Sequence, residues 1–386
     1  MEWLDIFRED AMTGKFKICL LLVFAVSGGA VAASQPVARY LLDGNALDEG
    51  PGALHGSMTD VTPTIDRFGN SDAAIHLNGS SSIVAFPAES TNGLTSGTIS
   101  FWVKVDTDSV QYNLLAKIPD QGDPLFRSQL GTDPPGYAPP LDRFYFKVNG
   151  ENIDYVPADS SFDFTVWNCF TLVWSQTQKR MYLNGELLST VNGSFTSPGV
   201  GDLVLGYNSQ SSGGVQERLR GSVDDLVIYD RAMSDIEVSL SCKLVSCYPL
   251  DGNADDFAGH FDASAEGTGI GEDPYGNVDG ALCFEATGAR IVVPAESTNS
   301  LPSGAILLFA RTATDQIQYN LFGKDYMWTN SRFRAQFGTI GSGYAPPLDE
   351  LYFKVNDTAI EYSNPLDMVV MDWHMYSFVW DEVGRR

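Results

Sequence analysis

Short runs of alternating apolar and polar residues dominate the chain. Residues 98–105 read Thr-Ile-Ser-Phe-Trp-Val-Lys-Val, with an apolar side chain at every second position, and residues 170–174 alternate in the same way. A period of two is typical of a β-strand with one buried face. Asn149-Gly150 and Asn184-Gly185 each separate two such runs. These dipeptides predict tight turns between antiparallel strands.

One segment departs from this strand pattern. Ser234-Asp-Ile-Glu237 has the serine and glutamate spacing of a capping box, which predicts a short helix after the last strand. Many short antiparallel strands over about 200 residues favour two packed sheets. We therefore predict an all-β fold in which two antiparallel sheets form a sandwich.

The chain repeats a long pattern once, at a nearly constant offset. The clearest matches are 40–46 (YLLDGNA) with 248–254 (YPLDGNA), and 136–149 (GYAPPLDRFYFKVN) with 343–356 (GYAPPLDELYFKVN). A repeat of this length is a whole domain, because solenoid units recur every ~20–50 residues. We predict two tandem domains, at 36–241 and 247–386, joined by a short linker at 242–246. Arg386 aligns with Arg180, so we expect the second domain to be incomplete at its C-terminal end.

Charge changes the range of expected partners. The chain has 24 Lys and Arg against 49 Asp and Glu, a formal net charge of −25. Such a chain repels nucleic acid and anionic lipid and suits divalent cations or neutral ligands. We therefore expect no nucleic-acid partner.

The N-terminal segment has the pattern of a secretory signal peptide. Lys15 and Lys17 precede an apolar run at 18–26, and small residues follow at 28–33. We predict that residues 1–33 are removed, with cleavage after residue 32 or 33, and that the mature protein is secreted or displayed at the cell surface without a membrane span. The alternative is an uncleaved anchor, although the apolar stretch is shorter than the ~20 residues that a spanning helix needs.

Five sequence blocks, in this order, resemble the laminin G-like jelly-roll family of the concanavalin A-like lectin/glucanase superfamily. They are 40–46 (YLLDGNA), 66–70 (DRFGN), 99–103 (ISFWV), 182–185 (YLNG) and 221–230 (GSVDDLVIYD). The resemblance covers nearly all of 36–241 and, in truncated form, 246–386. It implies a jelly-roll sandwich, an extracellular location and, in many members, binding of glycans or proteins with calcium.

In this fold the first strand pairs with the last. Residues 40–42 should therefore lie beside 223–229 in the first domain. The second domain has no counterpart of that last strand, so its residues 248–250 should border an unpaired sheet edge. The alternative is that another chain or a rearranged strand completes the edge.

The cysteines suggest disulfides, which an exported protein can form. Cys247 and Cys283 align with Arg39 and His76, so both are absent together from the first domain. Cys19 would leave with the signal peptide, so four cysteines remain, and among their three possible connectivities we predict the pairs Cys169–Cys242 and Cys247–Cys283. A zinc site is the weaker alternative, because the chain has no paired C-x-x-C motif.

Acidic and amide side chains gather near the first and last strands of the first domain. They are Asp43, Asn45, Asp48, Asp224 and Asp225, and the first three match Asp251, Asn253 and Asp256 in the second domain. Carboxylate and carbonyl oxygens are the ligands that Ca²⁺ takes, so we predict calcium as the cofactor. The alternative is that these side chains cap turns.

A central segment of each domain has the composition of a sugar-binding surface. Tyrosine rings stack on sugar faces, while Asp and Arg hydrogen-bond to hydroxyls. The candidate ligand-binding residues are Tyr112, Arg127, Tyr137, Asp142 and Tyr145 in the first domain and Tyr319, Arg334, Tyr344, Asp349 and Tyr352 in the second. The alternative is that these loops are simply rigid.

Signatures of catalysis are missing from the sequence. No Glu has an Asp two residues later, as the paired carboxylates of related glucanases require, and no G-x-S-x-G elbow occurs. We predict a non-catalytic binding protein for glycans or glycoproteins. The alternatives are spacer or adhesive modules of a larger surface protein, or accessory binding domains of a polysaccharide-degrading enzyme.

Overall fold

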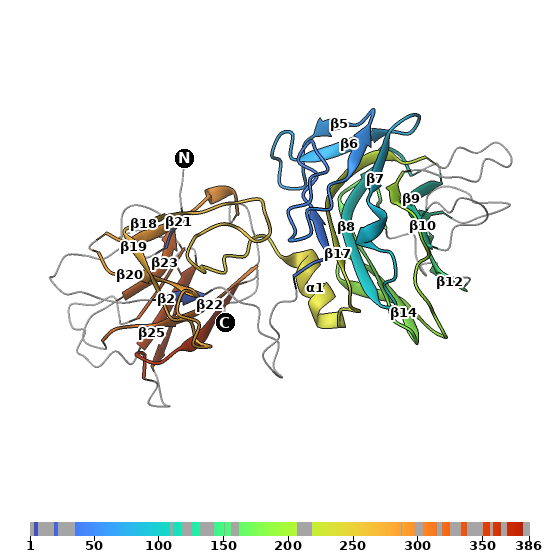
Figure 1. The fold of residues 1–386 in the computed structure, drawn as a ribbon. Helices are drawn as coiled ribbons and strands as arrows, with labels where there is room; N and C mark the ends of the chain where they lie inside the picture. Colours follow the sequence, from blue (N-terminus) through green and yellow to red (C-terminus); the bar gives the residue numbers. More distant parts are fainter. Residues whose placement is uncertain are drawn as a thin grey trace, which may run out of the picture. The chain divides into compact units, whose positions relative to one another are not determined.

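The structure is a computed structural model. It describes residues 4–6, 19–21, 35–108, 111–117, 126–131, 143–149, 151–155, 162–206, 218–286, 288–297, 304–314, 319–324, 333–337, 350–355, 358–363 and 369–380. These residues form antiparallel sheets, as predicted, and two compact units (Figure 1). The first unit is Gly28–Lys243, and the second combines Met1–Ser27 with Leu244–Arg386.

The first unit contains two sheets. Sheet I has the order β15 (Glu186–Asn192), β14 (Gln178–Leu183), β13 (Asn168–Trp174), β8 (Gly97–Val105), β17 (Arg220–Tyr229), β6 (Ala74–Asn78) and β5 (Thr62–Thr64), and β3 (Ala38–Tyr40) also pairs with β17. Sheet II has the order β12 (Glu151–Tyr155), β11 (Phe144–Val148), β10 (Phe126–Leu130), β9 (Tyr112–Lys117), β16 (Leu203–Leu205), β7 (Ile83–Phe86) and β4 (Ser57–Thr59). A 3-10 turn, η1 (Ala88–Ser90), follows β7.

The two sheets share one hydrophobic core. Every second residue of β8 and β13 faces it, and the rings of Phe101 and Phe170 stack 5.8 Å apart. Trp174 from sheet I meets Phe126 from sheet II edge-on, with 5.7 Å between ring centroids. Aromatic pairs of this geometry add to the stabilisation that burial gives. The predicted two-sheet sandwich is confirmed.

Local predictions in the first unit are also confirmed. Asn149 and Asn184 both adopt positive φ, at 48° and 52°, at the turns that join β11 to β12 and β14 to β15. The helix α1 (Asp235–Lys243) begins with the predicted capping box, because the Glu237 amide donates to Ser234 Oγ and the Ser234 amide donates to Glu237 Oε2. The first strand lies beside the last, with Tyr40 opposite Leu226.

The second unit also contains two sheets around a core. Sheet III has the order β19 (Thr268–Gly271), β20 (Ala281–Phe284), β2 (Cys19–Leu21), β22 (Gly304–Arg311) and β27 (His374–Trp380). Sheet IV has the order β18 (Ser264–Glu266), β21 (Arg290–Val293), β1 (Leu4–Ile6), β23 (Tyr319–Lys324), β24 (Phe333–Phe337), β25 (Glu350–Val355) and β26 (Thr358–Ser363). A 3-10 turn, η2 (Ala295–Ser297), follows β21.

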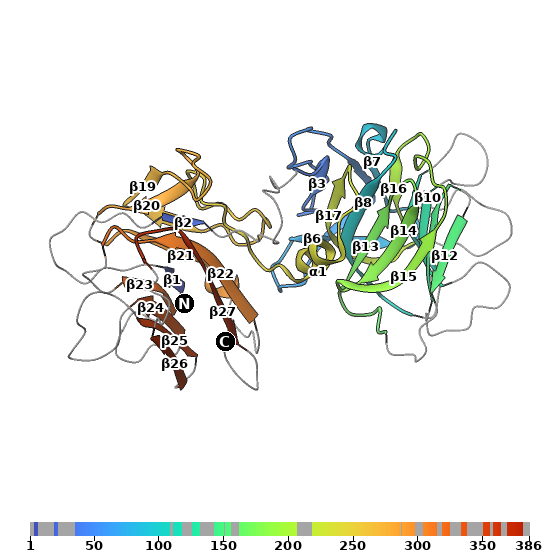
Figure 2. The same ribbon diagram turned by 90° about the horizontal axis from the view of Figure 1, so that it is seen from below.

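The strand orders of the two units correspond. Sheet IV repeats sheet II with β1 in the position of β16, and sheet III repeats part of sheet I with β2 in the position of β17. Figure 2 shows both short blue strands among the orange and red strands of the second unit. Residues 248–250, beside which we predicted an unpaired edge, form no strand, and β2 lies between β20 and β22, as in the alternative of a rearranged strand. In the part of the chain that the structure describes, no helix has the length and apolar character to cross a membrane.

Candidate functional site

The outer face of sheet II carries a cluster of polar side chains. Along β10, Phe126 and Leu130 enter the core, so the intervening Arg127 and Gln129 lie on the opposite face. Strand register places Gln129 between Asn113 of β9 and Tyr145 of β11, and Arg127 opposite Lys147. We name this set the first polar grid: Asn113, Arg127, Gln129, Tyr145 and Lys147.

Packing holds the grid in a fixed arrangement. The Arg127 guanidinium carbon lies 5.2 Å from the centre of the Tyr145 ring, and the Tyr145 hydroxyl donates to Asn152 Oδ1 at 2.7 Å. Arg127 and Lys147 are 6% and 8% exposed, and Gln129 is fully buried. Two cations directly opposite each other on neighbouring strands repel, so their placement here weakens the sheet unless anionic or polar groups surround them.

The second unit carries the same arrangement on the outer face of sheet IV. Register places Gln336 between Asn320 and Tyr352, and Arg334 opposite Lys354. The Arg334 guanidinium carbon lies 5.4 Å from the centre of the Tyr352 ring. We name Asn320, Arg334, Gln336, Tyr352 and Lys354 the second polar grid.

The structure brings together part of the predicted sugar-binding set. Arg127 and Tyr145 meet in the first grid, and Arg334 and Tyr352 meet in the second. Tyr137, Asp142, Tyr344 and Asp349 lie outside the described residues.

The prediction is wrong for Tyr112 and Tyr319. Both belong to the hydrophobic cores, because alternation along β9 and β23 turns the following residues, Asn113 and Asn320, outward instead. Sequence reasoning did not select Gln129 and Gln336. A comparison of Phe126-Arg-Ser-Gln-Leu with Phe333-Arg-Ala-Gln-Phe would have found them, since the outward Arg and Gln are identical while two inward residues differ.

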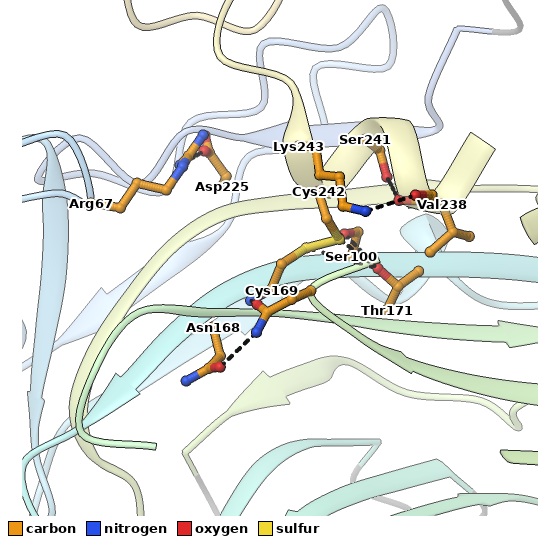
Figure 3. Close-up of a disulfide and its surroundings, with 12 residues drawn as sticks. Arg67, Ser100, Asn168, Cys169, Thr171, Asp225, Val238, Ser241, Cys242 and Lys243 are labelled. Carbon is orange, nitrogen blue, oxygen red and sulfur yellow. Dashed lines mark hydrogen bonds and ion pairs between the residues drawn. A yellow bond between two sulfur atoms is a disulfide. The ribbon is translucent and has the colours of Figure 1, made fainter. Parts of the chain in front are cut away.

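The outer face of sheet I carries a different cluster, centred on Arg67. Its guanidinium forms ion pairs with Asp224, at 3.0 Å, and with Asp225 (Figure 3). The same group lies 4.2 Å and 4.7 Å from the ring centres of Phe68 and Trp102. Asp224 is fully buried, and burial together with the neighbouring Asp225 raises its pKa well above the ordinary value.

The predicted calcium ligands do not form one set of available oxygens. Asp48 accepts backbone hydrogen bonds from Arg39, Gly50 and Leu54, at 2.7 to 2.8 Å, and Asn45 Oδ1 accepts one from Leu47. In the second unit Asp256 likewise accepts bonds from the amides of Cys247 and Ala258. These side chains cap turns, which was the alternative interpretation.

Two of the other predicted calcium ligands, Asp224 and Asp225, already have part of their negative charge neutralised by Arg67. Asp224 and Asp225 share Arg67, and Asp43 is close enough to Asp224 to raise its pKa. Within the described ranges no group of three or more His, Cys, Asp or Glu side chains has an arrangement that could hold a metal ion. The five residues therefore do not fit calcium as a set.

The Cys169–Cys242 disulfide is confirmed, with 5.8 Å between the two Cα atoms. It fastens the end of α1 to β13 on the outer face of sheet I (Figure 3). Near it, Val238 of the helix packs in a small apolar cluster with Val173 and Tyr182. The helix therefore covers the outer face of sheet I around Val173 and Tyr182.

The predicted Cys247–Cys283 disulfide is wrong. Cys247 keeps a thiol, whose pKa burial raises to about 12, while Cys283 is part of a disulfide. The aligned residues of the first unit explain why: Arg39 lies opposite Val227, and His76 lies opposite Ser222. Five residues of strand separate those positions by roughly 16 Å. A disulfide needs its Cα atoms within about 7 Å.

Sequence comparison agrees with the fold of the first unit. Residues 78–239 match the Laminin_G_3 family model, described as the concanavalin A-like lectin/glucanases superfamily. The match covers most of the first unit and agrees with its sandwich of two antiparallel sheets. A search of curated proteins gives no match to the chain.

Three solved structures illustrate the similarity of the chain to known folds. Domain 4 of AbnA, an extracellular arabinanase from Geobacillus stearothermophilus, in complex with arabinotriose, is 17% identical, with 53% of this chain and 97% of that domain covered and a TM-score of 0.40. The CBM40 of the Ruminococcus gnavus IT-sialidase, bound to alpha2,3 sialyllactose, is 17% identical, with 43% and 94% covered and a TM-score of 0.34. The binding domain of Botulinum neurotoxin DC, in complex with rat synaptotagmin II, is 10% identical, with 92% and 87% covered and a TM-score of 0.41.

Proposed function

We propose that the protein is a non-catalytic binding protein that recognises carbohydrate through its two polar grids. The observation that carries the proposal is the recurrence of the same five residue types, in the same register, on the outer face of one sheet in each unit. The inward residues of these strands change only in part, since Phe144 corresponds to Leu351 while Phe146 and Val148 correspond to Phe353 and Val355. The five outward residues are all unchanged, which packing of the core does not require.

The chemistry of the grids suits sugars. Amide groups of Asn113 and Gln129 can donate and accept hydrogen bonds, and the Arg127 guanidinium donates several in one plane. The Tyr145 ring supplies an apolar surface beside them. Arg127, Gln129 and Lys147 are at most 8% exposed, so binding of a sugar requires that these side chains become more accessible.

An extracellular location is the second part of the proposal. The Cys169–Cys242 disulfide supports it, because structural disulfides persist in oxidising compartments. Calcium stays a prediction. Its support is Asp224 Oδ1, which is buried and has no hydrogen-bond partner among the described residues. The Arg67 guanidinium, which already neutralises this carboxylate, argues against it.

A glycan array probed with the full chain tests the proposal. We expect saturable binding, which the double substitution Gln129→Leu with Gln336→Leu should reduce at least about tenfold by removing hydrogen bonds worth ~1.4 kcal/mol or more. Gln178→Leu, on β14 of sheet I, is the matched control and should bind like the wild type.

Circular dichroism of each variant separates loss of binding from loss of fold. Tyr145→Phe gives a milder test, because it removes one hydroxyl and keeps the ring. Wild-type binding by the folded double variant would contradict the role of the grids. Absence of binding by the folded wild-type chain to any glycan would favour the spacer interpretation.

A further inference from the structure

Two cationic residues lie side by side in the first polar grid. Residues directly opposite one another on antiparallel strands share a face of the sheet. Arg127 lies opposite Ala116 on one side and Lys147 on the other, and Lys147 lies opposite Asn152. These four residues, from β9 to β12, form one row across the outer face of sheet II. We name them the first cation row, because the row has two cationic residues and no acidic one.

The second unit repeats this row on the outer face of sheet IV. Arg334 lies opposite Gly323 and Lys354, and Lys354 lies opposite Ala359. We name these four residues the second cation row, which again has two cationic residues and no acidic one. In both rows the neighbouring strand on one side contributes only a small residue beside the arginine. Each row therefore has the same charge and the same small neighbour.

Other arginines of the first unit have no cationic counterpart in the second. Arg67 corresponds to Pro274, and Arg143 corresponds to Glu350. The two cationic residues of the first row are both retained in the second row, in a chain whose formal net charge is −25. The adjacent pair of cations is thus repeated where single arginines are not.

Placement of two cations in one row has an energetic cost. Like charges directly opposite each other on neighbouring strands are destabilising. Arg127 and Arg334 are each 6% exposed and Lys147 is 8% exposed, so water screens their charges less than it would at an open surface. An anion that bridges the arginine and the lysine is attracted to both and lessens their repulsion. The contacts that these side chains make in the free protein are then exchanged for contacts to the anion.

The neighbouring row of the same grid indicates what carries the anionic group. Asn113, Gln129 and Tyr145 lie opposite one another in that row, two residues along the strands and hence roughly 7 Å from the cation row. Amide groups and a tyrosine ring suit the hydroxyls and the apolar face of a sugar. The planar guanidinium of an arginine matches a carboxylate through two parallel hydrogen bonds. A sugar that carries a carboxylate satisfies both rows at once.

We propose that the polar grids select acidic sugars, in which a carboxylate is part of the sugar unit. Arg127 and Arg334 receive the carboxylate, and Lys147 and Lys354 add a second positive charge beside it. The amide groups of the neighbouring row receive the hydroxyls. This inference rests on the proposed function, because it specifies the ligand class of the same two sites.

Glycans in matched pairs test the proposal on the full chain. Each pair is an oligosaccharide of galacturonic, glucuronic or sialic acid and its carboxyl methyl ester, which keeps the rings and hydroxyls but lacks the charge. We expect at least one acid to bind at least about tenfold more tightly than its ester at low salt, which corresponds to ~1.4 kcal/mol. The preference should shrink as salt rises, because ions screen the attraction.

The other outcomes of this comparison separate the two proposals. Equal affinity for acid and ester, or binding of neutral glycans alone, would overturn the acidic class and leave carbohydrate binding intact. A preference for sulfated over carboxylated sugars would also overturn it, since the carboxylate is the group assigned to the arginines. Absence of binding by the folded chain to every glycan would overturn both proposals.

Substitution of the two arginines identifies the residues that read the charge. Arg127→Gln combined with Arg334→Gln should reduce the preference for acid over ester to about twofold or less, while the affinity for the ester stays near that of the wild type. Arg220→Gln is the matched control, because this arginine lies on β17 of sheet I with 61% of its side chain exposed. Circular dichroism verifies that each variant is folded.

The lysines provide a second pair of substitutions, which keeps the test decisive if the arginine variant does not fold. Lys147→Gln combined with Lys354→Gln should also reduce the preference, because it removes one of the two charges in each row. A folded variant of either kind that prefers the acid as strongly as the wild type would overturn the assignment. Equal weakening of acid and ester would contradict it too, since that result indicates a role in the shape of the site and not in the recognition of charge.

Discussion

The Nη1 atom of Arg67 lies 3.0 Å from Oδ2 of Asp224, although the two residues are 157 positions apart in the sequence. Asp224 is fully buried and the Arg67 side chain is 9% exposed, so the pair is largely removed from water. The guanidinium also contacts Asp225 and lies over the ring of Trp102. The chain itself thus supplies a positive charge beside the carboxylates for which we predicted calcium.

Removal of this charge should destabilise the first unit. Arg67→Met keeps an apolar side chain over Trp102 but leaves Asp224 and Asp225 without their cation, so we expect a loss of about 3 kcal/mol in the free energy of unfolding. Urea denaturation followed by tryptophan fluorescence measures it. The exposed pair of Lys243 and Glu186 provides the control, because Lys243→Met should cost under ~1 kcal/mol. Equal effects of the two substitutions would contradict the assigned role of Arg67.

Calcium can be tested directly by chelation. If calcium binds near Asp224, a chelator should lower the melting temperature of the full chain, and calcium should restore it, because a ligand that binds only the folded state stabilises it. Asp224→Ala should abolish this response. A wild-type melting temperature that is the same with calcium and with chelator would refute the calcium prediction and leave Arg67 as the charge that balances this cluster.

Lys117 should make the first unit more stable at alkaline pH. Its ammonium donates to Thr91 Oγ1, Asn92 Oδ1 and the Gly199 carbonyl, yet burial lowers its pKa from 10.5 to about 8. The unfolded state therefore binds the proton more tightly than the folded state does between these values. The contribution of Lys117 to stability rises with pH from about 8 to 10.5 and is lost as the pH falls through 8.

The free energy of unfolding of the wild type and of Lys117→Met, compared from pH 7 to pH 10.5, checks this dependence. The difference between wild type and variant should grow in favour of the wild type as the pH rises. A difference that stays constant, or changes in the other direction, would show that the lysine titrates normally in the folded protein.

The Cys169–Cys242 disulfide should stabilise the first unit by constraining its unfolded state. The bond closes a loop with a sequence separation of 73, and a loop of that size corresponds to about 4 kcal/mol. Replacing both cysteines by serine should lower the unfolding free energy of the first unit by that order, as measured by urea denaturation. Cys247→Ser, in the second unit, should leave the transition of the first unit in place. A double variant as stable as the wild type would show that packing of α1 alone suffices.

Much of the fold could be predicted because its signals are local. The turns at Asn149 and Asn184 need positive φ, which Asn and Gly tolerate, and the capping box at Ser234 joins residues three apart. Pairing of the first and last strands followed from the family resemblance. These features depend on neighbours in sequence or on an architecture shared by many proteins.

The candidate site could be predicted only in part, because it depends on which face of a strand each side chain occupies. The alternation of residues along a strand shows which side chains share a face, but it does not show which face is buried. A tyrosine such as Tyr112 can pack in a hydrophobic core or stack on a sugar, and here it packs in the core. Arg67 was missed since its partners come from β17, far away in the sequence. The Cys247–Cys283 prediction was wrong because it rested on the joint absence of both cysteines from the first domain, which says nothing of how far apart the fold places the two positions.

The pairing of Leu20 with Leu282 also bears on how the chain folds. Strands β1 and β2 precede the first unit in the sequence, and the strands that they pair with follow it. Closing so long a loop costs conformational entropy before any contact is gained, and folding slows as contacting residues become more distant in sequence. The first unit should therefore reach its native state early, while β1 and β2 pair with the second unit only later. That interval is when the newly made chain is most prone to aggregate.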